Sequence, residues 1–145
     1  MNLNGFETTD LQNTSPTTFA KYFSAEQANA ALPLVRRVVQ DIVEQYQIIM
    51  SNHAKLQQDR LVDEERQQAE AVQAEATEKM NSLASELSDI GCELKDWECG
   101  LVDFPARLDD RDVFLCWKLG EEQVSQWHEI HAGFTGRESI ADQFA

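Results

Sequence analysis

The stretch LVDFPARLDDRDVFLCWKL, Leu101–Leu119, decides the fold, because its pattern switches from helical to β periodicity. Two segments rich in β-forming residues flank the polar triplet DDR, which is typical of a hairpin connection. The second segment is largely apolar on both faces, so we expect a central strand with one face against helices. Pro105 cannot donate a hydrogen bond to a neighbouring strand and marks the first segment as an edge or bulged strand.

The segment QVSQWHEIH, Gln123–His131, follows the first two strands and fits two structures. The spacing of Val124, Trp127 and His131 suits a helix. The β-branched residues near its ends, and the Gly-Glu-Glu turn before it, favour a strand. We predict a third strand, so residues 100–140 form a three-stranded antiparallel β-meander followed by a terminal turn.

Upstream, residues 24–95 carry two heptad-like apolar series, which indicate two long helices. Ser24 with Gln27 forms a capping-box signature at the first helix, and Pro33 should kink or restart that helix. A reversal near 58–66 gives an antiparallel hairpin, but no Gly or Pro forces it, so one unbroken helix is the alternative. Gly91 and Gly100 are candidate stops, and Gly100 is the stronger candidate because strands follow it.

The predicted architecture is therefore α+β, a long helical hairpin kinked at Pro33 and packed with a small β-meander. Residues 1–18 are rich in Asn, Thr and Ser and predict a disordered tail. Residues 19–145 have the length and apolar content of a single domain.

Charge and composition exclude several classes of function. The net charge is -14, and residues 61–145 hold 7 Lys or Arg against 20 Asp or Glu, so nucleic acid would be repelled. No apolar run is long enough to span a membrane, and no secretory signal is visible. The odd number of cysteines, 3, without CxxC spacing predicts free thiols in a reducing cytoplasm.

Several motifs together resemble a known bacterial family. They are the FSAEQANAALPLV segment from Phe23, the GLVDFP segment from Gly100, LCWKLGE from Leu115, Trp127-His128 and GFTGR from Gly133. The chain is similar here to the domain-of-unknown-function family number twenty-two oh three. Gln27 stands where that family commonly has Glu, and the helical middle is longer and richer in Gln and Ala. The resemblance implies a shared fold and a set of marked residues, but no activity.

The two histidines and the glutamate of the segment WHEIH indicate a possible metal site. On a strand His128 and His131 point to opposite faces, so a local pair is not expected. Asp103, Glu121 and His128 form the better candidate set, because a meander could bring them together to bind a divalent transition metal, Zn, Mn or Fe. Glu129 is then a candidate general base. The alternative is that His128 hydrogen-bonds Asp103 or Glu121 and only satisfies a buried polar cluster.

The glycines and the arginine of the segment GFTGR indicate a possible anion or ligand site. Gly133 and Gly136 allow positive φ, so neighbouring N–H groups could form a nest, with Arg137 binding a carboxylate or phosphate. The alternative is a turn that buries Phe134 while Arg137 pairs with an acidic residue. Cys116, in the middle of a strand, is interpreted as a buried and inert thiol.

Two functions follow from these patterns. The first is a non-enzymatic cytoplasmic interaction or scaffold module, because a two-helix hairpin leaves apolar surface that a homodimer would cover as a four-helix bundle. The second is a small metal-dependent enzyme or metal-binding module that uses Asp103, Glu121 and His128. The sequence names no substrate, reaction or protein partner.

Overall fold

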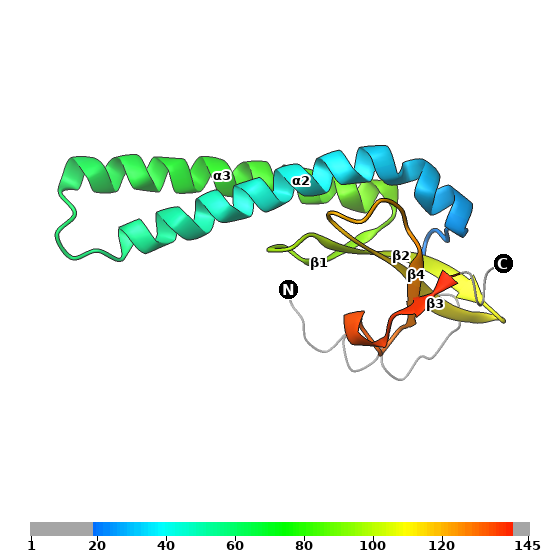
Figure 1. The fold of residues 1–145 in the computed structure, drawn as a ribbon. Coiled ribbons are helices and arrows are strands. Elements are labelled where there is room, and N and C mark those ends of the chain that lie inside the picture. The colour runs from blue at the N-terminus through cyan, green and yellow to red at the C-terminus, as the bar shows by residue number, and fades with distance from the viewer. Residues whose placement is uncertain (1–18, 141–145) are drawn as a thin grey trace, which may run out of the picture.

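The computed structural model describes residues 19–140, in which a helical hairpin lies across one face of a five-stranded antiparallel sheet (Figure 1). The predicted α+β class is confirmed, but the sheet has five strands rather than three. The predicted tail, residues 1–18, lies outside the described residues. The elements are α2 (Ala25–Leu56), α3 (Asp63–Ile90), β1 (Glu93–Asp96), β2 (Leu101–Leu108), β3 (Arg111–Lys118), β4 (Gln126–Glu129), a 3-10 turn η1 (Phe134–Gly136) and β5 (Glu138–Ser139).

Helix α2 begins as its sequence predicts. The backbone N–H of Gln27 donates to Ser24 Oγ over 3.0 Å, and the N–H of Ser24 donates to Gln27 Oε1 over 3.0 Å, which completes the capping box. The helix runs without a break through Pro33 to Leu56, so the chain does not restart there. A kink at Pro33 stays a prediction. The chain reverses between Leu56 and Asp63, and the unbroken-helix alternative is wrong.

Helix α3 ends at Gly91, and the preference for Gly100 as its stop is wrong. Gly91 has φ +111°, and its N–H donates to the carbonyls of Leu87 and Ser88, which is a glycine C-cap. The helix therefore ends early enough for residues 93–95, predicted as helical, to form strand β1. Gly100 lies instead in the turn between β1 and β2, with φ +77°.

The β2–β3 hairpin closes as the DDR triplet predicts. Asp109 and Asp110 both have positive φ, 51° and 65°, as a two-residue turn with the twist of a hairpin requires. The register that follows pairs Leu108 with Arg111 and Leu101 with Lys118. Strand β3 is central in the sheet, as predicted, because β4 and β5 follow on its other side.

Strand β2 contains Pro105 although β2 is not an edge strand. The pairing of β2 explains why the proline is tolerated. β1 pairs with β2 only as far as Asp103, so the side of β2 at Pro105 that faces away from β3 lacks a neighbouring strand. The Pro105 carbonyl on that side accepts the N–H of Phe23 over 2.7 Å. Backbone N and O of one residue in a strand point the same way, so the missing donor also faces this gap.

The two faces of the sheet differ in chemistry. The helix face carries the core: Val102, Phe104, Val113, Leu115 and Trp117 are buried against Leu32, Val35, Val39, Ile42 and Leu87 of the hairpin. On the far face, the strand register aligns a polar row of Glu93, Asp103, Cys116, Gln126 and Ser139. A row of polar residues across the middle of a sheet is unusual and directs attention to this face.

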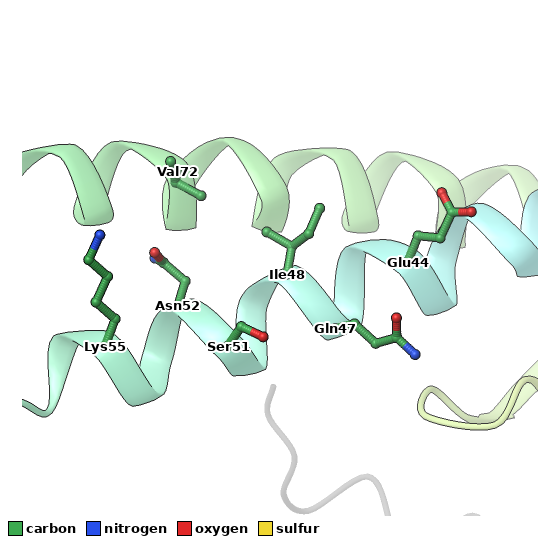
Figure 2. Close-up of a pocket in the computed structure, with 7 residues that line it drawn as sticks. All are labelled: Glu44, Gln47, Ile48, Ser51, Asn52, Lys55 and Val72. Atoms are coloured by element: carbon green, nitrogen blue, oxygen red, sulfur yellow. The ribbon is translucent and has the colours of Figure 1, made fainter.

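The turn end of the hairpin extends past the sheet (Figure 1). The fully buried residues of α2 all lie at or before Ile42, and Val43 is the last residue of the helix that packs against the common core. A groove of about 600 Å³ follows the two helices there (Figure 2), lined by Glu44, Gln47, Ile48, Ser51, Asn52, Lys55 and Val72. In residues 19–140, neither helix has the length and apolar content needed to cross a membrane.

Candidate metal centre

Asp103, Cys116 and His128 converge on the far face of the sheet. Asp103 and Cys116 are direct partners across β2 and β3, and His128 is paired with Phe114, the residue two before Cys116. One nitrogen, oxygen or sulfur atom from each of the three lies within 4.8 Å of the others. All three residues are at most 2% exposed. Among residues 19–140 this is the one group with three possible metal ligands.

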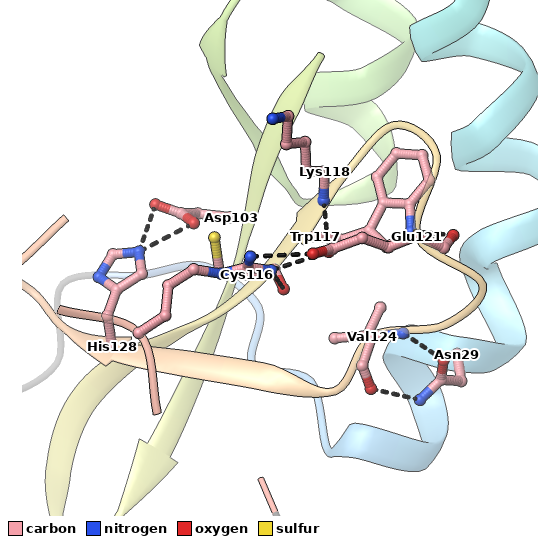
Figure 3. A network of polar contacts seen from close by, with 9 residues as sticks. Asn29, Asp103, Cys116, Trp117, Lys118, Glu121, Val124 and His128 are labelled. Carbon is pink, nitrogen blue, oxygen red and sulfur yellow. Dashed lines mark hydrogen bonds and ion pairs between the residues drawn. The ribbon is translucent and has the colours of Figure 1, made fainter. Parts of the chain in front are cut away.

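Both ring nitrogens of His128 have polar partners, and Figure 3 shows the contact with Asp103. Nδ1 lies 2.7 Å from the backbone carbonyl of Glu129, and Nε2 lies 3.0 and 3.1 Å from the two carboxylate oxygens of Asp103. A carbonyl oxygen only accepts hydrogen bonds, so Nδ1 must carry a proton and donate it. The tautomer fixed in this way directs Nε2, the usual metal-binding atom, toward Asp103 and Cys116.

Burial governs the protonation of the acidic groups. Burial raises the pKa of Asp103, and the neighbouring His128 opposes part of that rise. Burial, with the charge of Asp103, raises the pKa of Cys116 to about 12. The Cys116 side chain is therefore a thiol at neutral pH and hydrogen-bonds to the Asp103 carboxyl group. A thiolate here would need a cation to compensate its charge.

The donor set matches the ligands of a transition metal. Imidazole nitrogen, carboxylate oxygen and cysteine sulfur are the three protein ligands of zinc. Two nitrogen or oxygen ligands of a tetrahedral zinc ion lie about 3.3 Å apart, given metal–ligand distances of about 2.0–2.1 Å. The Nε2-to-carboxylate distances of 3.0 and 3.1 Å are close to that separation. Small side-chain shifts would therefore accommodate the ion.

A family model identifies the group of proteins to which this chain belongs. A model of the family described as an uncharacterized conserved protein, DUF2203, matches residues 21–140. The chain belongs to this family. The resemblance carried by its sequence motifs is thereby confirmed, and all three residues of the cluster lie in the matched range. No curated protein and no solved structure matches the chain.

Glu121 does not join the cluster, although the sequence predicts it beside Asp103 and His128. Its two carboxylate oxygens accept from Arg137 Nη1 and Nη2 over 2.9 and 2.8 Å, and one of them also accepts the Lys118 N–H over 2.9 Å. Burial acts to raise the pKa of Glu121, but these hydrogen bonds lower it by more. The carboxylate is thus engaged in a bidentate ion pair, and Cys116 takes the expected place of Glu121 in the cluster.

Glu129 contributes to the cluster through its backbone carbonyl. It pairs with Val113 in the register, so it shares the helix side of the sheet, opposite His128. Its carboxylate binds Arg111 over 2.6 and 3.0 Å, and this hydrogen bond holds the pKa of Glu129 below its usual value. Only its carbonyl reaches the site, where it fixes the imidazole of His128.

The residues of the predicted anion site do not form a nest of two glycines. Gly133 has φ +68°, but Gly136 is not among the residues with positive φ. Arg137 already binds Glu121 and also donates to the carbonyl of Cys116 over 3.3 Å. The alternative that Arg137 pairs with an acidic residue is what the structure shows. Phe134 is not buried, since it is 42% exposed, and lies 4.6 Å from the Arg137 guanidinium.

The prediction from the sequence did not include Cys116 in the metal site, although the hairpin register offered a signal for it. A two-residue turn at Asp109-Asp110 fixes the register of the hairpin, and that register places Cys116 opposite Asp103. From the sequence, Cys116 was interpreted only as a buried and inert thiol in the middle of a strand that is largely apolar on both faces. The register, once counted from the turn, would have replaced Glu121 by Cys116.

Proposed function

We propose that this chain is a metal-binding protein that holds one divalent transition metal between Asp103, Cys116 and His128. The observation that supports this is the convergence of three different ligand types within 4.8 Å at a fully buried position. A buried carboxyl group is costly unless it is compensated, and Asp103 is compensated by His128 and by the Cys116 thiol, which is a weak hydrogen-bond donor. A metal ion would compensate all three groups together.

The ligand set selects the class of metal. A cysteine sulfur with an imidazole favours Zn²⁺ or a similar borderline ion over Mg²⁺ and Ca²⁺, which prefer oxygen ligands alone. Three protein ligands leave the fourth tetrahedral position for water or a substrate, as in catalytic zinc sites. The thiol must be reduced to bind metal, which accords with the cytoplasmic location that the cysteine pattern predicts.

Cobalt titration tests the proposal, because a thiolate bound to Co²⁺ gives an intense near-ultraviolet charge-transfer band. The full chain, purified without a histidine tag and stripped with chelator, should develop this band and saturate at one Co²⁺ per chain. Excess Zn²⁺ should bleach it. Cys116→Ser should abolish the band because it removes the only sulfur in the group.

Cys99→Ser is the matched control, since Cys99 is also free but lies outside the group. It should titrate as the parent does. Asp103→Asn adds a second check, because an amide can still hydrogen-bond His128 Nε2 while losing the charge of the ligand; it should remain folded and bind Co²⁺ at least tenfold more weakly. A parent protein that stays without the band, or a Cys116→Ser variant that keeps it, would refute the metal site.

Self-association through the hairpin is a second candidate function, and a separate observation favours it. Ile48 is 41% exposed on the part of α2 that extends past the sheet. Ile48 also borders the groove between the helices (Figure 2). A homodimer that covers this part would bury surface that the monomer leaves in water. Sedimentation across dilution tests it, and a mass that stays at 16.5 kDa would contradict it.

A further inference from the structure

One side of α2 is exposed along most of the helix. Its residues follow one another at alternating spacings of four and three, which keeps them on one face of an α-helix. We call this set the outer stripe; all of its members are exposed, and they are Arg37, Asp41, Glu44, Ile48, Ser51 and Lys55. Four of them, from Glu44 onward, also line the groove beside α3. The outer stripe is therefore a continuous surface with Ile48 near its middle.

The outer stripe is electrically neutral in a strongly acidic protein. It contains two basic residues, Arg37 and Lys55, and two acidic residues, Asp41 and Glu44, whereas the whole chain carries -14. Helix α3 has eight acidic and two basic residues, so two copies of α3 would repel each other. A second copy that approaches the outer stripe therefore meets fewer like charges than one that approaches α3, and Lys79 of α3 borders the same grooves as Glu75 and Glu86.

We propose that a second copy of this chain docks on the outer stripe, with the two α2 helices antiparallel and crossing at Ile48. The proposal rests on the self-association proposed above and specifies its surface. A twofold axis at Ile48 places residues that are equally far before and after it opposite each other. Lys55, seven positions after Ile48, then faces Asp41 of the partner copy, seven positions before it. The symmetry makes this opposite-charge pair twice.

Charge also selects the register. If one copy slides by a helical turn, Lys55 moves opposite Arg37 of the other copy, and two like-charge contacts replace two favourable ones. At the register centred on Ile48, the isoleucines of both copies meet at the axis beside the groove, where each is 41% exposed in the monomer. An apolar centre flanked by complementary charges is the arrangement found in specific helix pairs.

Sedimentation equilibrium of the full chain and four variants tests the docking mode. The parent should show a dimer that dissociates on dilution. Ile48→Glu places two carboxylates together at the axis and should weaken dimerisation at least a hundredfold. Lys55→Glu and Asp41→Lys should each weaken it about tenfold, and the double variant should recover most of the loss. Circular dichroism confirms that each variant keeps its helices.

Met50→Glu is the matched control, because Met50 is similarly exposed on the same helix but lies off the outer stripe. It should dimerise as the parent does. A parent that is monomeric at every concentration would overturn self-association and this docking mode together. A dimer that resists Ile48→Glu, or a charge-swapped double variant that stays as weak as the single ones, would overturn the docking mode while self-association stands.

Discussion

At the scale of single residues, the contact between His128 and Asp103 determines what the far face of the sheet can do. Each side chain is 3% exposed, and the two are hydrogen-bond partners at a buried position. The Glu129 carbonyl fixes which imidazole nitrogen takes part. The same geometry that satisfies the pair without metal would present Nε2 to the proposed metal ion.

His128→Ala tests this dual role. Removing the imidazole leaves the buried Asp103 carboxyl group with only the weak hydrogen bond of the Cys116 thiol, which we expect to cost about 1–3 kcal/mol in the free energy of unfolding of the metal-free protein. Cobalt binding should be lost as well. Urea denaturation monitored by tryptophan fluorescence measures the first effect.

Trp127→Ala is the control for His128→Ala. Trp127 is the neighbouring residue, is 2% exposed and packs into the core on the helix face. Its truncation should cost more, about 3–5 kcal/mol, through lost apolar burial and a cavity. Cobalt binding of the folded Trp127→Ala variant should persist. If His128→Ala were as stable as the parent, the pair would contribute nothing to the fold.

At the scale of elements, Gly100 allows the turn between β1 and β2 to pack closely against helix α2. It closes the turn between β1 and β2 with φ +77°, a conformation that side chains disfavour. A Cβ atom at this position would lie 2.8 Å from Val39 Cγ1 of α2 and 2.9 Å from Leu119 Cβ. The backbone turn therefore fits directly against the helix, and the absence of a side chain allows α2 to approach the end of β3.

Gly100→Ala should destabilise the protein through both strain and overpacking. Gly120→Ala separates the two, because Gly120 also has positive φ, +108°, but a Cβ there meets nothing within 4 Å. We expect Gly120→Ala to cost about 1–2 kcal/mol from backbone conformation alone. Gly100→Ala should cost about 1–3 kcal/mol more. Equal thermal denaturation midpoints for the two variants would show that the contact with Val39 relaxes freely.

At the scale of the whole molecule, stability is unevenly distributed along the hairpin. Near the sheet, α2 and α3 bury Val35, Val39, Ile42 and Leu87 in the common core. Beyond it, Ala69 and Ala76 are the buried residues of α3, and α2 has none after Ile42. Small side chains bury little apolar area, so the extended half depends on helix-to-helix contact alone.

Hydrogen exchange measured by mass spectrometry should reveal this gradient. Backbone amides in residues 48–75 should exchange through local opening, well before those of residues 30–42 and the strands β2 and β3. The measurement is made at a protein concentration low enough to keep the chain monomeric. Uniform protection along both helices would show that the hairpin unfolds as one unit with the sheet.

The sequence by itself determined the local structure that local chemistry governs. The Ser24 capping box, the two-residue hairpin turn and the alternation along β3 depend on neighbouring residues, so each was predictable. It also determined the α+β class and two of the three residues of the cluster, Asp103 and His128. These predictions needed only periodicity and the identity of the side chains.

Only the tertiary structure decided the rest, because it depends on contacts between segments that are distant in the sequence. β1 and β5 are short, carry weak patterns and exist because β2 and β4 offer them open edges. Glu121 faces Arg137 instead of Asp103 because the loop after β3 and the C-terminal segment meet there. Cys116 reached the cluster through the register of β2 with β3, a property of paired strands that neither strand possesses alone.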